Sequence, residues 1–121
     1  MIISHYSDKN FKGKIEPKYF GSNSYTQNSV KEASIARSFF YIGRGREYFL
    51  NGAKYRYTAE IDNHKIYNLE IDNKNLKAIC KNFEDILKRV KFLGYRGIRG
   101  NNGYDIVCLF YPLKYTNKRV I

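Results

Sequence analysis

The sequence predicts a single α+β domain, spanning residues 1–121, with mixed or antiparallel sheets and one long amphipathic helix. Three observations lead to this fold class. Short β-prone runs occur in both halves of the chain, one long segment carries its apolar residues on a single helical face, and an apolar run lies near the C-terminus. At 121 residues, 43% of them hydrophobic, the chain can bury a core of its own.

The N-terminal third predicts a strand, a loop and a short helix. Residues 2–7 alternate apolar and polar side chains, as a half-buried strand does. Residues 8–28 are rich in Lys, Asn, Gly, Pro and Ser and read as loop. Ser29 with Glu32 matches a capping box, so a short helix is expected to run to about Arg37.

The next segments favour strands. Residues 38–42 are aromatic and β-prone, and the Gly-Arg-Gly-Arg stretch at 43–46 ends them. Residues 55–61 and 66–71 are two β-prone runs on either side of four turn-forming residues, 62–65. That arrangement predicts an antiparallel hairpin.

Residues 75–93 predict the long helix. Its apolar side chains recur at three- and four-residue steps, and most of the opposite side chains are Lys or Arg. Asp72 or Asn73 can cap its start, and Gly94 lies where a left-handed residue is expected after a helix. The apolar run 104–111, which Gly103 and Pro112 bound, predicts a buried strand at or near the centre of the sheet, with the helix packed across it.

The charge balance is strongly basic. Lys and Arg number 22 against 11 Asp and Glu, giving a net charge of +11. Such a balance favours an acidic partner, either nucleic acid or an acidic protein surface. The alternative is that lysine enrichment serves solubility alone.

A membrane-spanning segment, secretion and a metal site are disfavoured. No apolar run approaches the roughly 20 residues of a membrane-spanning helix, and the N-terminus does not resemble a secretory signal, so a cytoplasmic protein is expected. Cys80 and Cys108 lie within apolar patterns and are expected to be reduced, buried thiols. The two cysteines and two histidines match no zinc-site spacing, so no metal is expected.

Several short motifs follow one another in a recognisable order. They are His5-Tyr6-Ser7 on the first strand, a Pro- and Gly-containing loop (15–21), a short helix and an aromatic strand that meet within 36–41, the predicted hairpin, the long helix, Gly94-Tyr95-Arg96-Gly97, and Leu109-Phe110-Tyr111-Pro112. In this order they resemble the small ADP-ribosyltransferase-like domains found in bacteria, phages and mobile elements. The resemblance covers nearly the whole chain, although each motif alone is common.

The resemblance implies NAD as the substrate and a cleft on the first two strands. Cleaving the nicotinamide–ribose bond requires the ribose to be held, the nicotinamide to be stacked, the phosphates to be neutralised and the oxocarbenium-like charge to be stabilised. His5, with Ser7 beside it, takes the place of the ribose contact. The strand Ser38–Tyr41 would line the cleft, with Tyr41 rather than Phe40 as the stacking ring.

The remaining implied roles involve phosphate and charge. Arg37, with Arg44 and Arg46, could neutralise the pyrophosphate. Asp105 is the acid nearest the position of the family's catalytic Glu, so Asp105 and His5 are the candidate catalytic residues. Asn102 could hold a ribose hydroxyl, while Glu16 and Glu60 are other acids that folding could bring near.

Two functions follow as expectations. The first is transfer of ADP-ribose from NAD to a protein or nucleic-acid target, for example by a phage-encoded modifier of host defence or transcription. The alternative is a noncatalytic basic module that binds nucleic acid or blocks a nucleic-acid-binding protein. Both imply an acidic macromolecular partner. The candidate contacts are the Arg44/Arg46 loop and the basic helix face Lys77, Lys81, Lys88, Arg89 and Lys91.

Overall fold

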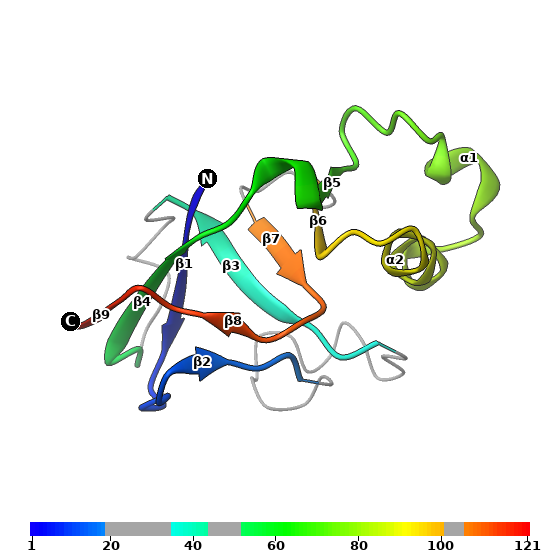
Figure 1. Ribbon diagram of the computed structural model, residues 1–121. Coiled ribbons are helices and arrows are strands. Elements are labelled where there is room, and N and C mark those ends of the chain that lie inside the picture. The colour runs from blue at the N-terminus through cyan, green and yellow to red at the C-terminus, as the bar shows by residue number, and fades with distance from the viewer. Residues whose placement is uncertain (19–34, 44–51, 101–105) are drawn as a thin grey trace.

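A computed structural model describes residues 1–18, 35–43, 52–100 and 106–121 (Figure 1). In these ranges the chain forms a small α+β domain that is mostly sheet. The strands are β1 (Ile2–Ser7), β2 (Lys14–Ile15), β3 (Ser38–Ile42), β4 (Tyr55–Glu60), β5 (Ile66–Asn68), β6 (Gly97–Arg99), β7 (Ile106–Leu109), β8 (Leu113–Lys114) and β9 (Asn117–Val120). The helices are α1 (Leu76–Ile79) and α2 (Phe83–Phe92), and a 3₁₀ turn spans Asn63–Lys65.

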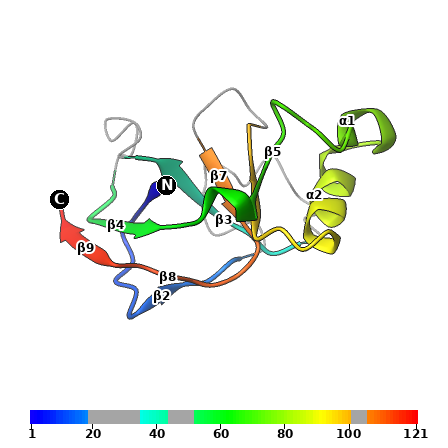
Figure 2. The same ribbon diagram turned by 45° about the horizontal axis from the view of Figure 1, so that its top comes forward.

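Within the described ranges, seven strands make one mixed sheet in the order β5-β6-β7-β3-β1-β4-β9. All neighbours are antiparallel except β5 and β6, which are parallel. The short β2 and β8 pair separately. Figures 1 and 2 place α1 and α2 at the β5–β6 end of the sheet and the C-terminus at the β9 end.

The two faces of the sheet bury two separate cores. The first core includes Ile3, Phe40 and Tyr57 together with Ile15 and Leu113 of the β2–β8 pair. The second core lies under the helices and includes Leu87 and Val90 of α2 and Ile98 of β6. On β7, Val107 belongs to the first core and its neighbour Cys108 to the second. β7 is therefore buried on both faces, which explains why the run 104–111 is apolar without alternation.

The predictions for three strands agree with the structure. β1 and β3 occupy the ranges that were expected, and β7 lies in the interior of the sheet within 104–111. The helix expected over 29–37 lies mostly outside the described residues. Its predicted end is wrong, because Arg37 is in an extended bridge with Lys18.

The predicted hairpin is wrong. β4 pairs with β1 and β9, whereas β5 pairs with β6 at the opposite edge of the sheet. After β4 the Ile61 amide donates to the carbonyl of Met1, so the chain continues along β1 instead of turning back. The carbonyl of Lys65 then accepts a hydrogen bond from the amide of Arg96, and the residues that follow Lys65 pair with β6.

The single long helix is also wrong, because the chain breaks between α1 and α2. Cys80 has extended dihedral angles, and the side chain of Asn82 accepts a hydrogen bond from the amide of Asp85 as the N-cap of α2. Gly94, at φ +94°, ends α2 as expected. Asp72 does receive the first amides of α1, those of Leu76 and Lys77. None of the helices described is long and apolar enough to cross a membrane.

Candidate functional site

His5 lies in an aromatic environment on the β2–β8 side of the sheet. It is opposite Tyr57 in the register of β1 and β4. Its ring centroid is 5.2 Å from that of Phe40, 5.9 Å from Phe11 and 6.4 Å from Tyr57. Ser7, two residues along the same strand, shares this face because side chains alternate along β1.

The hydrogen bonding of His5 fixes its ring. Nδ1 lies 2.7 Å from the carbonyl oxygen of Phe39, so Nδ1 carries the proton and donates it. Burial lowers the pKa of His5 below its ordinary value of 6.5; the Phe39 carbonyl raises it, and the charge of Lys18 lowers it further. The ring is therefore neutral at pH 7.

Tyr41 lies on the other face of the sheet. In the register of β1 and β3 it is opposite Ser4, and its ring is 5.9 Å from that of Tyr6. The aromatic residue of β3 that faces His5 is Phe40, which is almost completely buried. The structure therefore does not bring His5 and Tyr41 into one cleft, because the choice between Phe40 and Tyr41 depended on a register that the sequence does not reveal.

Arg37 contacts α2 rather than a cleft beside His5. Its guanidinium Nη2 donates to both carboxylate oxygens of Glu84, at 2.6 and 2.7 Å, and its Nε donates to the carbonyl of Ile35. The Arg37 side chain is 1% exposed, so this largely buried ion pair joins the residue before β3 to α2. The neighbouring Ser38 is also buried, and its hydroxyl has no hydrogen-bond partner among the described residues.

The remaining candidates for the NAD site are not assembled in the described structure. Asn102 and Asp105 lie outside the described residues, as do Arg44 and Arg46. Of the other acids considered, Glu16 is exposed and pairs with Lys14 at 3.5 Å. Glu60 is opposite Ile2, and so lies on the face away from His5.

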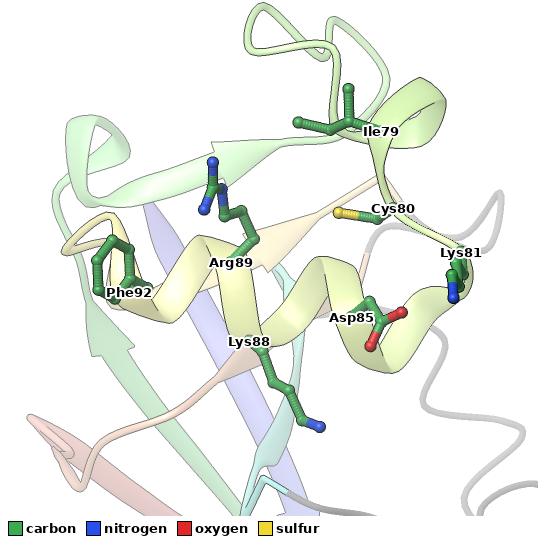
Figure 3. A pocket seen from close by; sticks show the side chains of 7 residues that line it. All are labelled: Ile79, Cys80, Lys81, Asp85, Lys88, Arg89 and Phe92. Carbon is green, nitrogen blue, oxygen red and sulfur yellow. The ribbon is translucent and has the colours of Figure 1, made fainter.

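An open groove of about 700 Å³ lies along α1 and α2 (Figure 3). Its lining combines basic and apolar side chains: Ile79, Cys80, Lys81, Asp85, Lys88, Arg89 and Phe92. Figure 3 shows Arg89 extending toward Ile79, while Lys88 extends from the other side of α2. The break at Cys80 makes the groove, because it lets α1 leave the axis of α2.

The groove collects part of the predicted basic face. Lys81, Lys88 and Arg89 line it, whereas the Lys91 ammonium lies 5.3 Å from the centre of the Tyr111 ring. Two apolar residues in it are unexpectedly exposed, Ile79 at 61% and Phe92 at 80%. Phe92 could have been noticed in the sequence, because it falls outside the apolar face predicted for the helix.

The two cysteines are free thiols in different surroundings. Cys108 is buried, and burial raises its pKa to about 12. Cys80 is half-buried at the edge of the groove, so the expected burial is complete only for Cys108. In the described part of the chain, no group of three or more His, Cys, Asp or Glu is placed to hold a metal ion.

No protein-family model, no curated protein and no solved structure matches this chain.

Proposed function

We propose that this protein is a noncatalytic binding module that holds an acidic protein partner in the groove along α1 and α2. The observation that carries the proposal is that three cations and two exposed apolar side chains line one open groove. The positive charge of the groove favours a negatively charged partner. The exposed apolar side chains favour binding because a partner that covers them removes apolar surface from water.

The cations of the groove are available to a partner. Only two ion pairs occur among the described residues, Lys14 with Glu16 and Arg37 with Glu84, and neither uses Lys81, Lys88 or Arg89. Asp85 is the single acid of the lining, against three cations. The groove therefore has an excess of positive charge.

The apolar lining favours a protein over a nucleic acid. Ile79 is aliphatic and offers nothing to a phosphate or to the hydrogen-bonding edge of a base. It can instead contact an apolar side chain inserted between acidic residues, and Phe92, at the C-terminal end of α2, can contact a second one. An acidic segment with an apolar anchor fits both features.

The test uses fluorescence anisotropy with two labelled probes, a Glu-rich peptide that contains Leu and Phe and a single-stranded DNA of similar charge. The peptide should bind, and its affinity should fall as salt rises from about 50 to about 200 mM. The double variant Lys81→Glu/Lys88→Glu should abolish binding, and Phe92→Ala should weaken it about tenfold or more. The control Lys65→Glu/Lys114→Glu reverses two exposed lysines elsewhere and should bind as the wild type does.

Two outcomes would contradict the proposal. Equal losses in the groove variant and the control would mean that only net charge matters. Binding of DNA but not peptide, with no effect of Phe92→Ala, would assign the groove to nucleic acid.

ADP-ribosyl transfer from NAD is the second candidate. It is favoured by the neutral ring of His5, held by the Phe39 carbonyl among aromatic side chains on the first strand. Tyr41 on the other face and Arg37 bound to Glu84 count against it. Calorimetric titration with NAD, using His5→Ala and the exposed His64→Ala as its control, tests this candidate; no binding at about 1 mM NAD removes it.

A further inference from the structure

β9 forms an open edge of the seven-stranded sheet. It pairs with β4 on one side, and no strand of the described residues lies on its other side. At the opposite edge of the sheet, Ile66 and Tyr67 of β5 are buried. In β9, by contrast, Asn117, Arg119 and Val120 are exposed. β9 is therefore the edge that another chain can reach.

The backbone of β9 presents hydrogen-bonding groups to this outer edge. The Ile121 amide donates to the carbonyl of Lys54, the residue before β4, at 2.9 Å, so the backbone of Ile121 points toward β4. Backbone groups alternate in direction along an antiparallel strand. Those of Arg119 therefore also point toward β4, whereas the amides and carbonyls of Lys118 and Val120 point away from it and are placed to pair with an added strand.

The side chains of β9 make this edge basic. Arg119 is directly opposite Arg56 in the register of β4 and β9, and it is exposed. On the other face, the Lys118 ammonium lies 4.8 Å from the centre of the Tyr55 ring. Neither of the two ion pairs among the described residues uses Lys118 or Arg119. Positive charge thus lies on both faces of the open edge, where acidic side chains of an added strand could pair with it.

Val120 adds an apolar position to the same edge. Its side chain is 72% exposed and lies on the face of Lys118, since side chains two residues apart share a face. Every strand pair from β7 to β9 is antiparallel, and we expect the same of an added strand. Its residues opposite Val120, Arg119 and Lys118 would then be apolar, acidic and acidic, in that order along its chain.

We propose that the outer edge of β9 binds an acidic segment of another protein as an added antiparallel strand. Main-chain hydrogen bonds to Lys118 and Val120 supply the pairing, and the charges of Lys118 and Arg119 select the sequence. A second copy of this chain fits poorly, because two antiparallel β9 strands would bring the basic residues of one copy against those of the other. Figures 1 and 2 place β9 at the end of the sheet away from α1 and α2, so the site is separate from the groove and does not rest on the function proposed for it.

The probe is a short labelled peptide with Val-Glu-Glu at its centre and Thr on both sides. In the antiparallel register its Val is opposite Val120 and its second Glu is opposite Lys118, so the amides of these two peptide residues point toward β9. The amide of the first Glu, opposite Arg119, points away. Methylating the nitrogens of Val and of the second Glu removes the donors that pair, whereas methylating the nitrogen of the first Glu is the matched control.

Two-dimensional NMR and amide hydrogen exchange follow the binding at about 150 mM salt, where long-range attraction is screened. The unmodified peptide should bind with a dissociation constant on the order of 100 μM, shift the amides of Lys118 and Val120, and slow the exchange of both. The control peptide should bind within about threefold of this affinity. The peptide methylated at both pairing nitrogens should bind about tenfold more weakly or worse.

Two pairs of variants locate the site on the protein. Val120→Pro removes an outward amide but no hydrogen bond to β4, so the fold should be retained and binding should weaken about tenfold; Val120→Ala keeps the amide and should lose about threefold at most. Arg119→Glu should weaken binding about tenfold, whereas Lys65→Glu, in the 3₁₀ turn before β5, should stay within about twofold. The groove variant Lys81→Glu/Lys88→Glu should also stay within about twofold. Amide spectra show whether each variant is folded.

Losses with Val120→Pro and with methylation of the pairing nitrogens, while both controls bind, support the proposal whether or not the groove binds its own peptide. No saturable shifts at about 2 mM peptide would overturn it, and the charges of β9 would then serve only to keep other strands away. Equal losses with both methylated peptides, or a loss in the groove variant as large as that in Arg119→Glu, would overturn it as well. Self-association without peptide that Val120→Pro abolishes would assign the edge to a second copy instead.

Discussion

The surroundings of His5 couple the stability of the fold to pH. Burial holds the pKa of His5 below 6.5, the value of the ring in water, and the Phe39 carbonyl offsets only part of that effect. The folded state therefore binds fewer protons than the unfolded state near this pH. The stabilisation is fully present above about pH 6.5, and it is lost as the pH falls from there through the folded pKa.

We expect His5→Gln to flatten this dependence. The wild-type free energy of unfolding, from urea melts, should decline between about pH 7 and pH 5, and the decline should be smaller in His5→Gln. His64 is exposed in the 3₁₀ turn, so His64→Gln should retain the wild-type decline. Parallel curves for wild type and His5→Gln would show that the ring does not control this range.

Gly97 is required by a close approach of two strands. A Cβ at this position would lie 2.3 Å from the carbonyl oxygen of Cys108 and 2.8 Å from Cδ2 of Leu109. The first contact is with backbone, so β6 and β7 would have to separate.

Gly97→Ala should therefore lower the free energy of unfolding by about 1–3 kcal/mol, the usual range for overpacking. Gly94→Ala is the matched control. Its Cβ would meet nothing within 4 Å, so only the left-handed backbone is strained, at roughly 1 kcal/mol. Chemical denaturation measures both variants; a smaller loss for Gly97→Ala than for Gly94→Ala would contradict the close approach.

Single residues of the candidate site were only partly predictable. That His5 and Ser7 share a face follows from the period of a strand. The position of Tyr41 depends on how β3 aligns with β1, and alternation within one strand does not determine alignment with another.

Among the elements, local patterns gave strand positions but not strand partners. β1 and β3 lie where their patterns placed them. The partners of β4 and β5 are distant in sequence, and long-range pairing outweighed the turn signal at 62–65. The break between α1 and α2 did have a local signal, since Asn82 is a preferred cap with Asp85 three residues later.

We expect Asn82→Ala to lower the free energy of unfolding by about 1 kcal/mol, because the amide of Asp85 loses its side-chain acceptor. Asn73→Ala replaces an exposed Asn before α1 and should change it by less than about 0.5 kcal/mol. Thermal and urea melts compare the two. If Asn82→Ala is neutral and gains helical circular dichroism, the chain prefers one continuous helix and the cap is not what divides α1 from α2.

At the scale of the whole molecule, positive charge is in excess and little of it is neutralised internally. The net charge is +11, and the described residues contain two ion pairs. Like charges confined to a compact fold repel one another and are farther apart in the unfolded chain. Net charge therefore favours a partner and at the same time opposes folding.

Salt should consequently act on binding and on folding in opposite directions. Raising sodium chloride from about 20 to about 200 mM shortens the screening length to less than the width of the domain, so self-repulsion weakens. We expect the melting temperature of the unliganded protein to rise by several degrees over this range, on the order of 1 kcal/mol for a domain of this size. Binding of the acidic peptide should weaken over the same range.

The double variant Lys81→Glu/Lys88→Glu has a lower net charge, so its melting temperature should depend less on salt than that of the wild type. A wild-type melting temperature that is constant or falls with sodium chloride would mean that the charges are spaced widely enough not to repel, and the excess would then matter only for binding.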